Sequence, residues 1–222
     1  MPSMQFPTQI DLVEFISHYA HDLRSPFNRI MGFSKIMLKG QDGPLTDFQR
    51  EDLNTVYQNG VYAFTLVSNL VDIARLIAKE KVLSLAMTSI SLVVDQALAQ
   101  WKKLRPDQTV QFRVENQANT PSIQVDEAQF QQALVAIFAC VLEFVQKPAQ
   151  IFILVSEEPG WLVLTITSQG QLSKAPSQID IDMYGYIGHT IVQLHGGQFR
   201  RQESGENGAT ICLLLPKNYS LS

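Results

Sequence analysis

The chain has 222 residues, of which 45% are hydrophobic and 17% are charged, and its formal net charge is −4. This composition is typical of a folded globular protein and excludes a largely disordered chain. The slightly acidic balance gives no reason to expect a nucleic-acid partner. Residues 1–10 lack the basic start and apolar core of a signal peptide, and the longest apolar run, 133–142, is too short to span a bilayer. We therefore expect a cytoplasmic protein without a membrane partner, in which Cys140 and Cys212 are reduced thiols.

Two long amphipathic helices are predicted first. Apolar residues recur at helical spacing over residues 9–39 and again from Thr46 to about residue 79, with helix breakers at 40–44 between them. Thr46 followed by Gln49 is typical of an N-terminal capping box. Each helix would be about 45 Å long, and two such helices cannot bury their apolar stripes against each other alone. We expect a homodimer in which two hairpins form a four-helix bundle.

After the second helix the pattern changes to shorter elements. Alternating or apolar runs predict strands at 82–87, 109–114, 149–156, 161–168, 198–202 and 209–215. Helical spacing and caps predict helices at 91–104, 126–146 and 183–195, the second of them forming much of the core. Helices interleaved with mostly antiparallel strands predict an α/β sandwich. The predicted fold class is therefore α+β, with a helical hairpin over residues 1–81 and an α/β sandwich over residues 82–222.

The most distinctive motif runs from His21 to Asn28 and reads His-Asp-Leu-Arg-Ser-Pro-Phe-Asn. This segment resembles the phosphoacceptor helix of two-component sensor histidine kinases, whose pattern is His, acid, Leu, Arg, Thr or Ser, Pro, an apolar residue and often Asn. A single histidine on a helix is usually only a solvated side chain, but this context favours a phosphoacceptor. The resemblance also implies that the second unit has the fold of the histidine kinase ATP-binding domain.

The resemblance assigns roles to the residues around the histidine. Neutral imidazole is a nucleophile near pH 7, which suits His21 to carry a phosphoryl group. Asp22 occupies the position of the acid that orients and polarises the imidazole in the family. Arg24 is expected to steady phosphoryl oxygens, and Ser25 replaces the commoner Thr that positions water in the phosphatase reaction. Two further polar residues on this helix, Asn28 and Arg29, are expected to contact the partner protein.

The nucleotide-binding motifs of the same family are not matched. Two asparagines that hold Mg²⁺ and phosphate in the family correspond to Ala136 and Cys140, which cannot supply hard oxygen ligands. The aspartate that binds adenine corresponds to Ser168. Small residues before the last helix correspond to Asp182 and Tyr184, and an acidic side chain there would repel a triphosphate. These differences predict that ATP binding has been lost.

We interpret the sequence as a histidine phosphotransferase derived from a histidine kinase, exchanging phosphoryl between His21 and a response-regulator receiver domain. The receiver would supply the Mg²⁺ and the aspartate, so we expect no cofactor or metal on this chain. Two alternatives stay open. One is a non-catalytic pseudokinase that binds and regulates a kinase or response regulator, and the other is an active kinase with a divergent nucleotide site. His18 is expected to be solvated and His195 to be structural.

Overall fold

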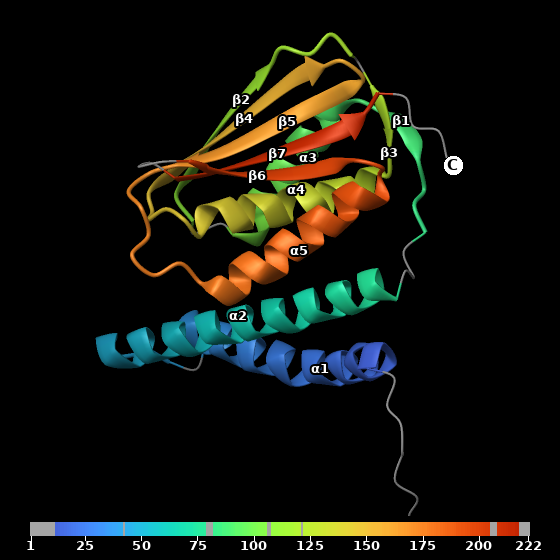
Figure 1. Cartoon of the computed structure of the whole chain (residues 1–222). Coiled ribbons are helices and arrows are strands. Elements are labelled where there is room, and N and C mark those ends of the chain that lie inside the picture. Colours follow the sequence, from blue (N-terminus) through green and yellow to red (C-terminus); the bar gives the residue numbers. More distant parts are fainter. Residues whose placement is uncertain are drawn as a thin grey trace, which may run out of the picture. The chain divides into compact units, whose positions relative to one another are not determined.

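The computed structural model describes residues 12–41, 43–78, 82–105, 108–120, 122–204 and 208–217. Two compact units make up the chain, residues 1–80 and residues 81–222. The first is a helical hairpin, and the second combines a five-stranded sheet with three helices (Figure 1). The predicted α+β fold class, a hairpin followed by an α/β sheet domain, is therefore confirmed.

The hairpin consists of α1 (Leu12–Leu38) and α2 (Asp47–Ile77), which lie side by side (Figure 1). Thr46 caps α2 as predicted: its side chain accepts a hydrogen bond from the Gln49 backbone N–H, and the Gln49 side chain accepts one from the Thr46 backbone N–H. The helices approach closely at Gly60, where a Cβ would lie 3.2 Å from Cγ of Met31. Both predicted helices are confirmed. The first ends at Leu38, one residue before its predicted end, and the predicted residues 9–11 and 79 lie outside the described residues.

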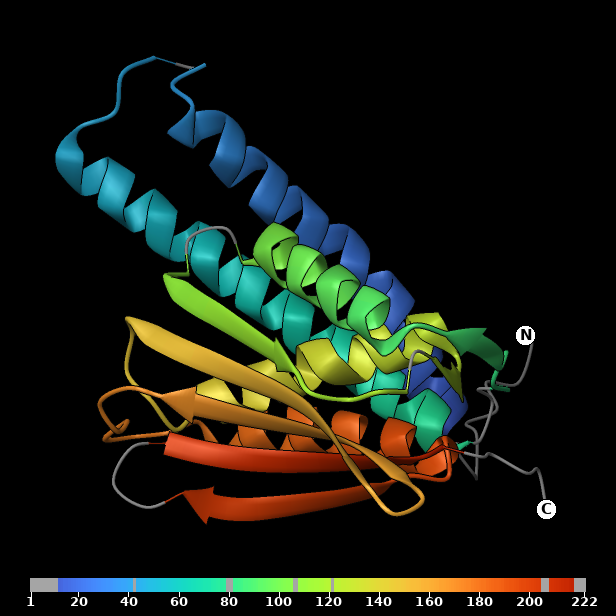
Figure 2. The same ribbon diagram turned by 90° about the horizontal axis from the view of Figure 1, so that it is seen from above.

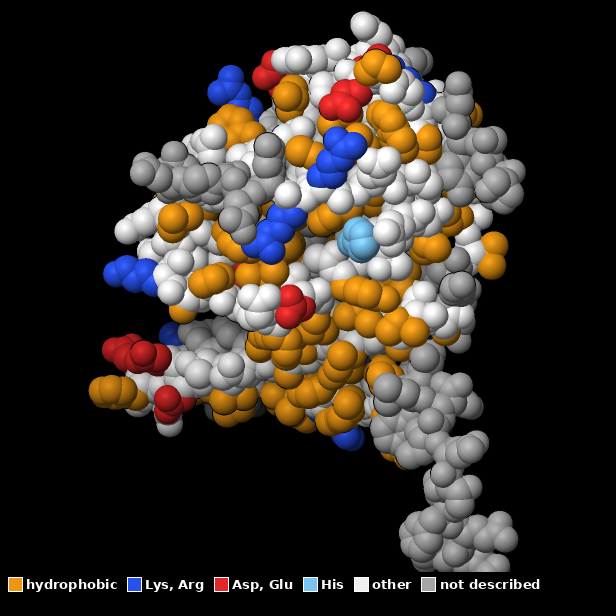
Figure 3. All heavy atoms as spheres, viewed as in Figure 1, with side chains coloured by type: hydrophobic (Ala, Val, Ile, Leu, Met, Phe, Trp, Pro, Cys, Tyr) orange, Lys and Arg blue, Asp and Glu red, His pale blue; other side chains and the backbone are white. Residues whose placement is uncertain are grey.

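Both helices of the hairpin leave large hydrophobic side chains exposed. Six of these side chains recur every seven or fourteen residues along a helix: Leu23, Ile30 and Met37 on α1, and Val56, Leu70 and Ile77 on α2. Figure 3 shows hydrophobic side chains gathered over the hairpin. A seven-residue repeat of apolar residues is the pattern of helices that pack lengthwise in bundles. We call these six residues the seam. They remain exposed to solvent in a single chain.

By length and composition alone, α2 is also apolar enough to cross a membrane. Core helices of water-soluble proteins pass the same test, because they too carry long apolar stripes. The first half of α2 is polar on one face, where Asp47, Glu51 and Asn54 are exposed. The expectation that no membrane is involved stays a prediction.

In the second unit, five strands form one sheet in the order β2-β4-β5-β7-β6. Neighbouring strands are antiparallel except β2 and β4, which are parallel. The five strands of this sheet are β2 (Val110–Asn116), β4 (Ala149–Glu158), β5 (Trp161–Gln169), β6 (Gln198–Ser204) and β7 (Gly208–Pro216). Two further strands, β1 (Ala86–Thr88) and β3 (Ile123–Val125), form a separate antiparallel pair.

Three helices cover one face of the sheet: α3 (Ile90–Leu104), α4 (Glu127–Leu142) and α5 (Gln178–Leu194) (Figures 1 and 2). The core between the layers includes an aromatic cluster in which Trp101 meets the rings of Phe112 and Phe138, each at a centroid distance of 6.2 Å. Almost all of the second half of α4 is buried, as its apolar sequence predicts. The Asp126 side chain caps this helix by accepting a hydrogen bond from the backbone N–H of Gln129.

Several predicted boundaries were wrong. The strand expected over 82–87 is limited to β1, and the short β3 was missed because three residues are too few to show an alternating pattern. The helix expected to continue to residue 146 ends at Leu142. Helix α5 begins five residues earlier than expected, because the Ser177 hydroxyl accepts a hydrogen bond from the Asp180 backbone N–H as an N-cap.

The crossing of α4 and α5 depends on Gly188. A Cβ at Gly188 would lie 2.7 Å from Cγ1 of Ile137, whereas a Cβ at Gly185 meets nothing closer than Sγ of Cys140 at 3.8 Å. We expect Gly188→Ala to destabilise the second unit by about 1–3 kcal/mol, because the helices must separate. Gly185→Ala on the same helix should be neutral or stabilise it by about 0.5–1 kcal/mol.

Urea unfolding followed by tryptophan fluorescence measures this difference, since both tryptophans, Trp101 and Trp161, belong to the second unit. Equal unfolding free energies for the two alanine variants would contradict a tight crossing at Gly188.

Candidate functional site

His21 lies on the exposed surface of α1, as predicted. Its side chain is 84% exposed, and its Nδ1 is 3.5 Å from Oδ1 of Asp22, whose side chain is 65% exposed. This separation is an ion-pair distance rather than a short hydrogen bond, and a contact so exposed orients the imidazole more than it stabilises the helix. With Nδ1 facing the carboxylate, Nε2 is the nitrogen left to act as a nucleophile. The side chain of His18 lies outside the described residues.

The predicted site residues of α1 come together around His21. A surface hollow of about 520 Å³ is lined by His21, Arg24, Ser25, Asn28 and Arg29. These positions lie on one face of a single helix over about two turns, which is what their spacing in the sequence predicts. The hollow holds one nucleophile, two guanidinium groups and two neutral polar groups. It therefore suits an anion that approaches from solvent.

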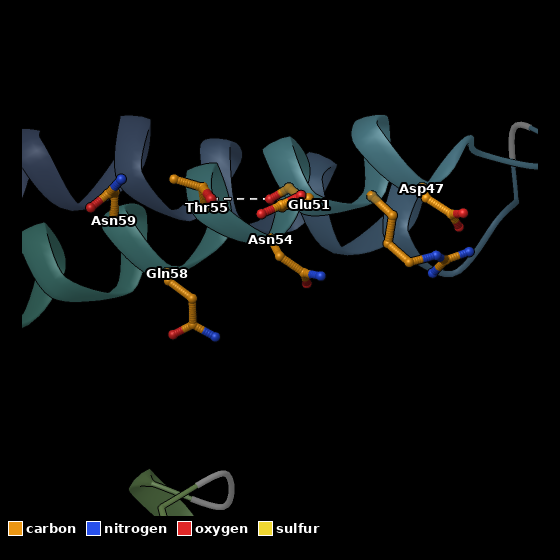
Figure 4. A pocket seen from close by; sticks show the side chains of 7 residues that line it. Asp47, Glu51, Asn54, Thr55, Gln58 and Asn59 are labelled. Carbon is orange, nitrogen blue, oxygen red and sulfur yellow. Dashed lines mark hydrogen bonds between the residues drawn. The ribbon is translucent and has the colours of Figure 1, made fainter.

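A second hollow lies along the first half of α2. It is lined only by polar residues: Asp47, Arg50, Glu51, Asn54, Thr55, Gln58 and Asn59. Figure 4 shows that the side chains it labels project from one helix. Arg50 donates a hydrogen bond to the backbone carbonyl of Leu38, so it ties α2 to the end of α1. Thr55 donates to the backbone carbonyl of Glu51 within the same helix. These contacts are structural, and the hollow contains no histidine or cysteine nucleophile.

The two α4 positions that hold Mg²⁺ and phosphate in the resembling kinases are closed here. Ala136 and Cys140 are both buried. The thiol of Cys140 lies 3.8 Å from the backbone carbonyl of Ile181, which brings α4 directly against α5. Burial raises the pKa of Cys140 to about 11, so the sulfur stays protonated at neutral pH. A protonated thiol is a poor metal ligand.

Ser168, at the position of the family's adenine-binding aspartate, makes hydrogen bonds within the fold. Ser168 is fully buried, and its hydroxyl accepts a hydrogen bond from the Ala209 backbone N–H at 3.1 Å and faces the Ala209 carbonyl at 3.4 Å. Gly208 lies so close that a Cβ there would be 2.1 Å from the Ser168 carbonyl oxygen. The Ser168 hydroxyl thus links β5 to the start of β7 by hydrogen bonds to Ala209, which occupy it within the fold.

On α5 the two remaining nucleotide positions differ from each other. Asp182 is exposed, and its Oδ1 accepts a hydrogen bond from Gln178 at 2.7 Å. Tyr184 is buried, and its hydroxyl accepts a hydrogen bond from Arg105 at 3.1 Å. The Arg105 guanidinium also lies 4.2 Å from the ring centroid of Trp101. Sequence reasoning missed this stack, although the four-residue spacing of Trp101 and Arg105 was a usable signal.

The segment between β5 and α5 is short and tied down. The backbone N–H of Gln146 donates to the carbonyl of Gln171 at 2.6 Å, and that of Ser173 donates to the carbonyl of Phe144 at 2.9 Å. The Ser177 N–H donates to the side chain of Glu143, whose pKa is raised by burial. In the part of the chain that the structure describes, no cluster of three or more His, Cys, Asp or Glu residues could hold a metal ion.

His195 has the structural role predicted for it. Its Nε2 accepts a hydrogen bond from the Asp126 backbone N–H at 3.0 Å, and its Nδ1 lies 2.8 Å from the Ile191 carbonyl. Both contacts together require the neutral tautomer with the proton on Nδ1. The Asp126 carboxylate in turn accepts a hydrogen bond from the Ser84 backbone N–H at 2.8 Å. The imidazole thus links the end of α5 to the start of α4.

Burial lowers the pKa of His195 below its ordinary value, because the charged form is desolvated. The unfolded chain therefore binds a proton at this histidine more readily than the folded chain. Its contribution to stability is complete above the unfolded pKa of about 6.5 and is lost as the pH falls from there toward the folded pKa. We expect the unfolding free energy of the second unit to fall more steeply between about pH 7 and pH 5 in the wild type than in His195→Gln. Identical slopes for the wild type and His195→Gln would contradict this prediction.

Comparisons with known proteins agree with the arrangement around His21. Residues 11–79 match the His Kinase A (phospho-acceptor) domain. Circadian input-output histidine kinase CikA of Synechococcus elongatus is 22% identical over 224 residues, covering 92% of this chain and 30% of that protein. Cell-division control histidine kinase PdhS of Brucella canis is 26% identical over 159 residues, covering 71% of this chain and 15% of that protein. The chain thus spans less than a third of the length of these curated relatives.

Solved structures share the fold at low sequence identity. Full-length ShkA in complex with AMPPNP gives a TM-score of 0.68 at 20% identity, covering 94% of this chain and 47% of that chain. The histidine kinase AdeS of Acinetobacter baumannii gives 0.60 at 15% identity, covering 90% of this chain and 98% of that chain. ThkA in complex with the response regulator TrrA gives a TM-score of 0.60 at 15% identity, covering 92% of this chain and 61% of that chain. The structures show the fold, and together with the phosphoacceptor match over residues 11–79 and the curated relatives they support a protein of the two-component sensor histidine kinase family.

Proposed function

We propose that this protein is a histidine phosphotransferase of a cytoplasmic two-component phosphorelay, in which His21 exchanges phosphoryl with the aspartate of a response-regulator receiver domain. The observation that carries the proposal is the exposed imidazole of His21, held by Asp22 within a hollow that also contains Arg24, Ser25 and Asn28. ATP has no part in this reaction. The Mg²⁺ that accompanies phosphoryl transfer would be bound by the receiver, and this chain would hold no cofactor.

The chemistry requires only one nucleophile and good alignment. Nε2 of His21 attacks the phosphorus of the receiver's acyl phosphate, a P–N bond forms, and the P–O bond to the receiver aspartate breaks with its electron pair leaving on the carboxylate. The imidazole becomes cationic as the bond forms, and the Asp22 carboxylate beside Nδ1 stabilises that charge. The return transfer is the same sequence reversed. Positioning supplies most of the rate, because little other covalent chemistry is needed.

The second unit supports a reaction without ATP. Its nucleotide positions are used for packing: Cys140 lies against α5, Ser168 binds the backbone of β7, and Tyr184 accepts a hydrogen bond from Arg105. A triphosphate would have to break these contacts and would still find no hard ligand for its Mg²⁺ at Ala136. These same contacts favour the alternative of a pseudokinase scaffold, which differs only in whether His21 is used.

We further propose that the protein acts as a homodimer. The seam on α1 and α2 leaves six large hydrophobic residues between 39% and 57% exposed in one chain. A second hairpin with the same seven-residue repeat would bury them in a four-helix bundle. The interface should be large and apolar, above about 2,000 Å² in total.

Phosphoryl transfer from phosphorylated receiver domains of the same organism tests the proposal. A relay should gain label within one turnover, and the label should be acid-labile and base-stable, as phosphohistidine is. Calorimetric titration with Mg-ATP should show no saturable binding with a Kd below about 100 μM, equivalent to roughly −5.5 kcal/mol. Tighter ATP binding would restore the active-kinase alternative. Receivers that bind but never transfer label would favour the scaffold.

A further inference from the structure

Two arginines flank His21 from opposite sides of the α1 surface. At 100° and 1.5 Å per residue, Arg24 lies about 60° around the helix on one side and about 4.5 Å along it. Arg29 lies about 80° around on the other side and about 12 Å along the axis. Both line the hollow that contains the imidazole. The hollow that contains the imidazole therefore has an arginine on each side of His21.

The direction of helical side chains brings Arg29 nearer than its position along the axis suggests. Cα–Cβ bonds in an α-helix tilt toward the N-terminus, and a long side chain covers the turn that precedes its own Cα. The His21 side chain tilts the same way, but the longer Arg29 side chain reaches further back, over the turn of Ser25. The presence of Arg29 in the lining of the same hollow agrees with this direction.

Neither guanidinium is fully used within the described hairpin. Arg29 is exposed, and no hydrogen bond or ion pair of its side chain is seen among residues 12–41 and 43–78. Nε of Arg24 is buried and has no hydrogen-bond acceptor among the described residues. Other arginines have structural partners, such as Arg50 with the Leu38 carbonyl and Arg105 with Tyr184. Arg29 therefore lines the hollow with donors that the described hairpin does not engage, whereas the buried Nε of Arg24 is not open to an anion there.

We infer that Arg29 binds the phosphoryl group during transfer, from the side of His21 opposite Arg24. The inference rests on the proposed phosphotransfer function and extends it to one residue. The transferring group carries its charge on three equatorial oxygens while the P–O bond of the receiver breaks and the P–N bond forms. A planar guanidinium donates to such oxygens in pairs, so arginines on two sides can bind two of them at once. Arg29 is thus a group that contacts the reacting atoms and not only the surface of the partner.

Single-turnover transfer from a phosphorylated receiver separates these roles. In Arg29→Gln, the transfer rate at saturating receiver should fall about 10- to 100-fold, because one of the cations that stabilise the transition state is removed. The receiver concentration at half-saturation should change by less than about threefold, and Arg29→Lys should recover part of the rate. Lys35→Gln is the matched control, since Lys35 is an exposed cation on the same side of α1, about 21 Å beyond His21. It should transfer within about twofold of the wild type.

Each other outcome has a definite meaning. An Arg29→Gln variant that changes only the half-saturating concentration would make Arg29 a docking contact and overturn the inference. An Arg29→Gln variant that transfers at the wild-type rate would also overturn the inference. In both cases the wild type accepts label, so the proposed function would survive. If the wild type itself accepts no label from any receiver, the proposed function fails and this inference fails with it. Helical content and dimer mass measured for every variant exclude a folding defect as the cause.

Discussion

Replacing His21 with glutamine should abolish phosphoryl labelling, with the loss exceeding about 1,000-fold, because the only proposed acceptor nitrogen is removed. The fold should not change, since the imidazole is 84% exposed and its one contact in the described structure is with the neighbouring Asp22. Labelling by a phosphorylated receiver followed by gel separation measures the first effect. Thermal unfolding measures the second effect. The unfolding midpoints of the wild type and the variant should differ only by the small amount typical of surface substitutions.

The control for this experiment is His18→Gln on the same helix. His18 precedes His21 by three residues and lies about 60° around the helix from it, so transfer should be largely unchanged. Label retained by His21→Gln would show that another residue accepts phosphoryl and would refute the assigned role. Loss of label in His18→Gln, with His21 intact, would indicate that His18, one turn earlier, is the acceptor.

Replacing Leu70 with aspartate should convert the proposed homodimer to monomers or unfold the hairpin. Leu70 is 46% exposed in one chain and lies on the seam, so a partner hairpin would bury it. Because the proposed dimer is symmetric, one substitution would place two carboxylates at the interface, and burying an unpaired charge costs several kcal/mol. Light scattering at micromolar concentration gives the mass, and circular dichroism gives the helical content that distinguishes dissociation from unfolding.

A matched pair of valines supplies the control. Val56 belongs to the seam and is 46% exposed, whereas Val82 lies outside the hairpin helices and is 88% exposed. Val56→Asp should weaken the dimer, and Val82→Asp should leave the mass and stability unchanged. A dimeric Leu70→Asp variant, or a wild type that is monomeric at micromolar concentration, would contradict the four-helix bundle.

Local patterns in the sequence determined much of this protein. Thr46 and Gln49 predicted the start of α2, Asp126 predicted the start of α4, and both caps are formed. The positions around His21 could be placed on one helix face because their spacing alone decides it. The fold class followed from the same periodicity, together with the resemblance to histidine kinases. All of these signals involve residues within about two helical turns of one another.

Only the tertiary structure decided how distant segments use their polar groups. The sequence placed Ser168 where the family has its adenine-binding aspartate, but did not show that its hydroxyl joins β5 to Ala209 of β7. It placed Tyr184 at a nucleotide position, but not under the guanidinium of Arg105, 79 residues earlier in the chain. Short strands such as β3 were missed for a related reason, since their formation depends on pairing with β1 and not on their own pattern. Contacts of this kind depend on the three-dimensional packing of several elements at once, which the spacing of residues along the chain does not encode.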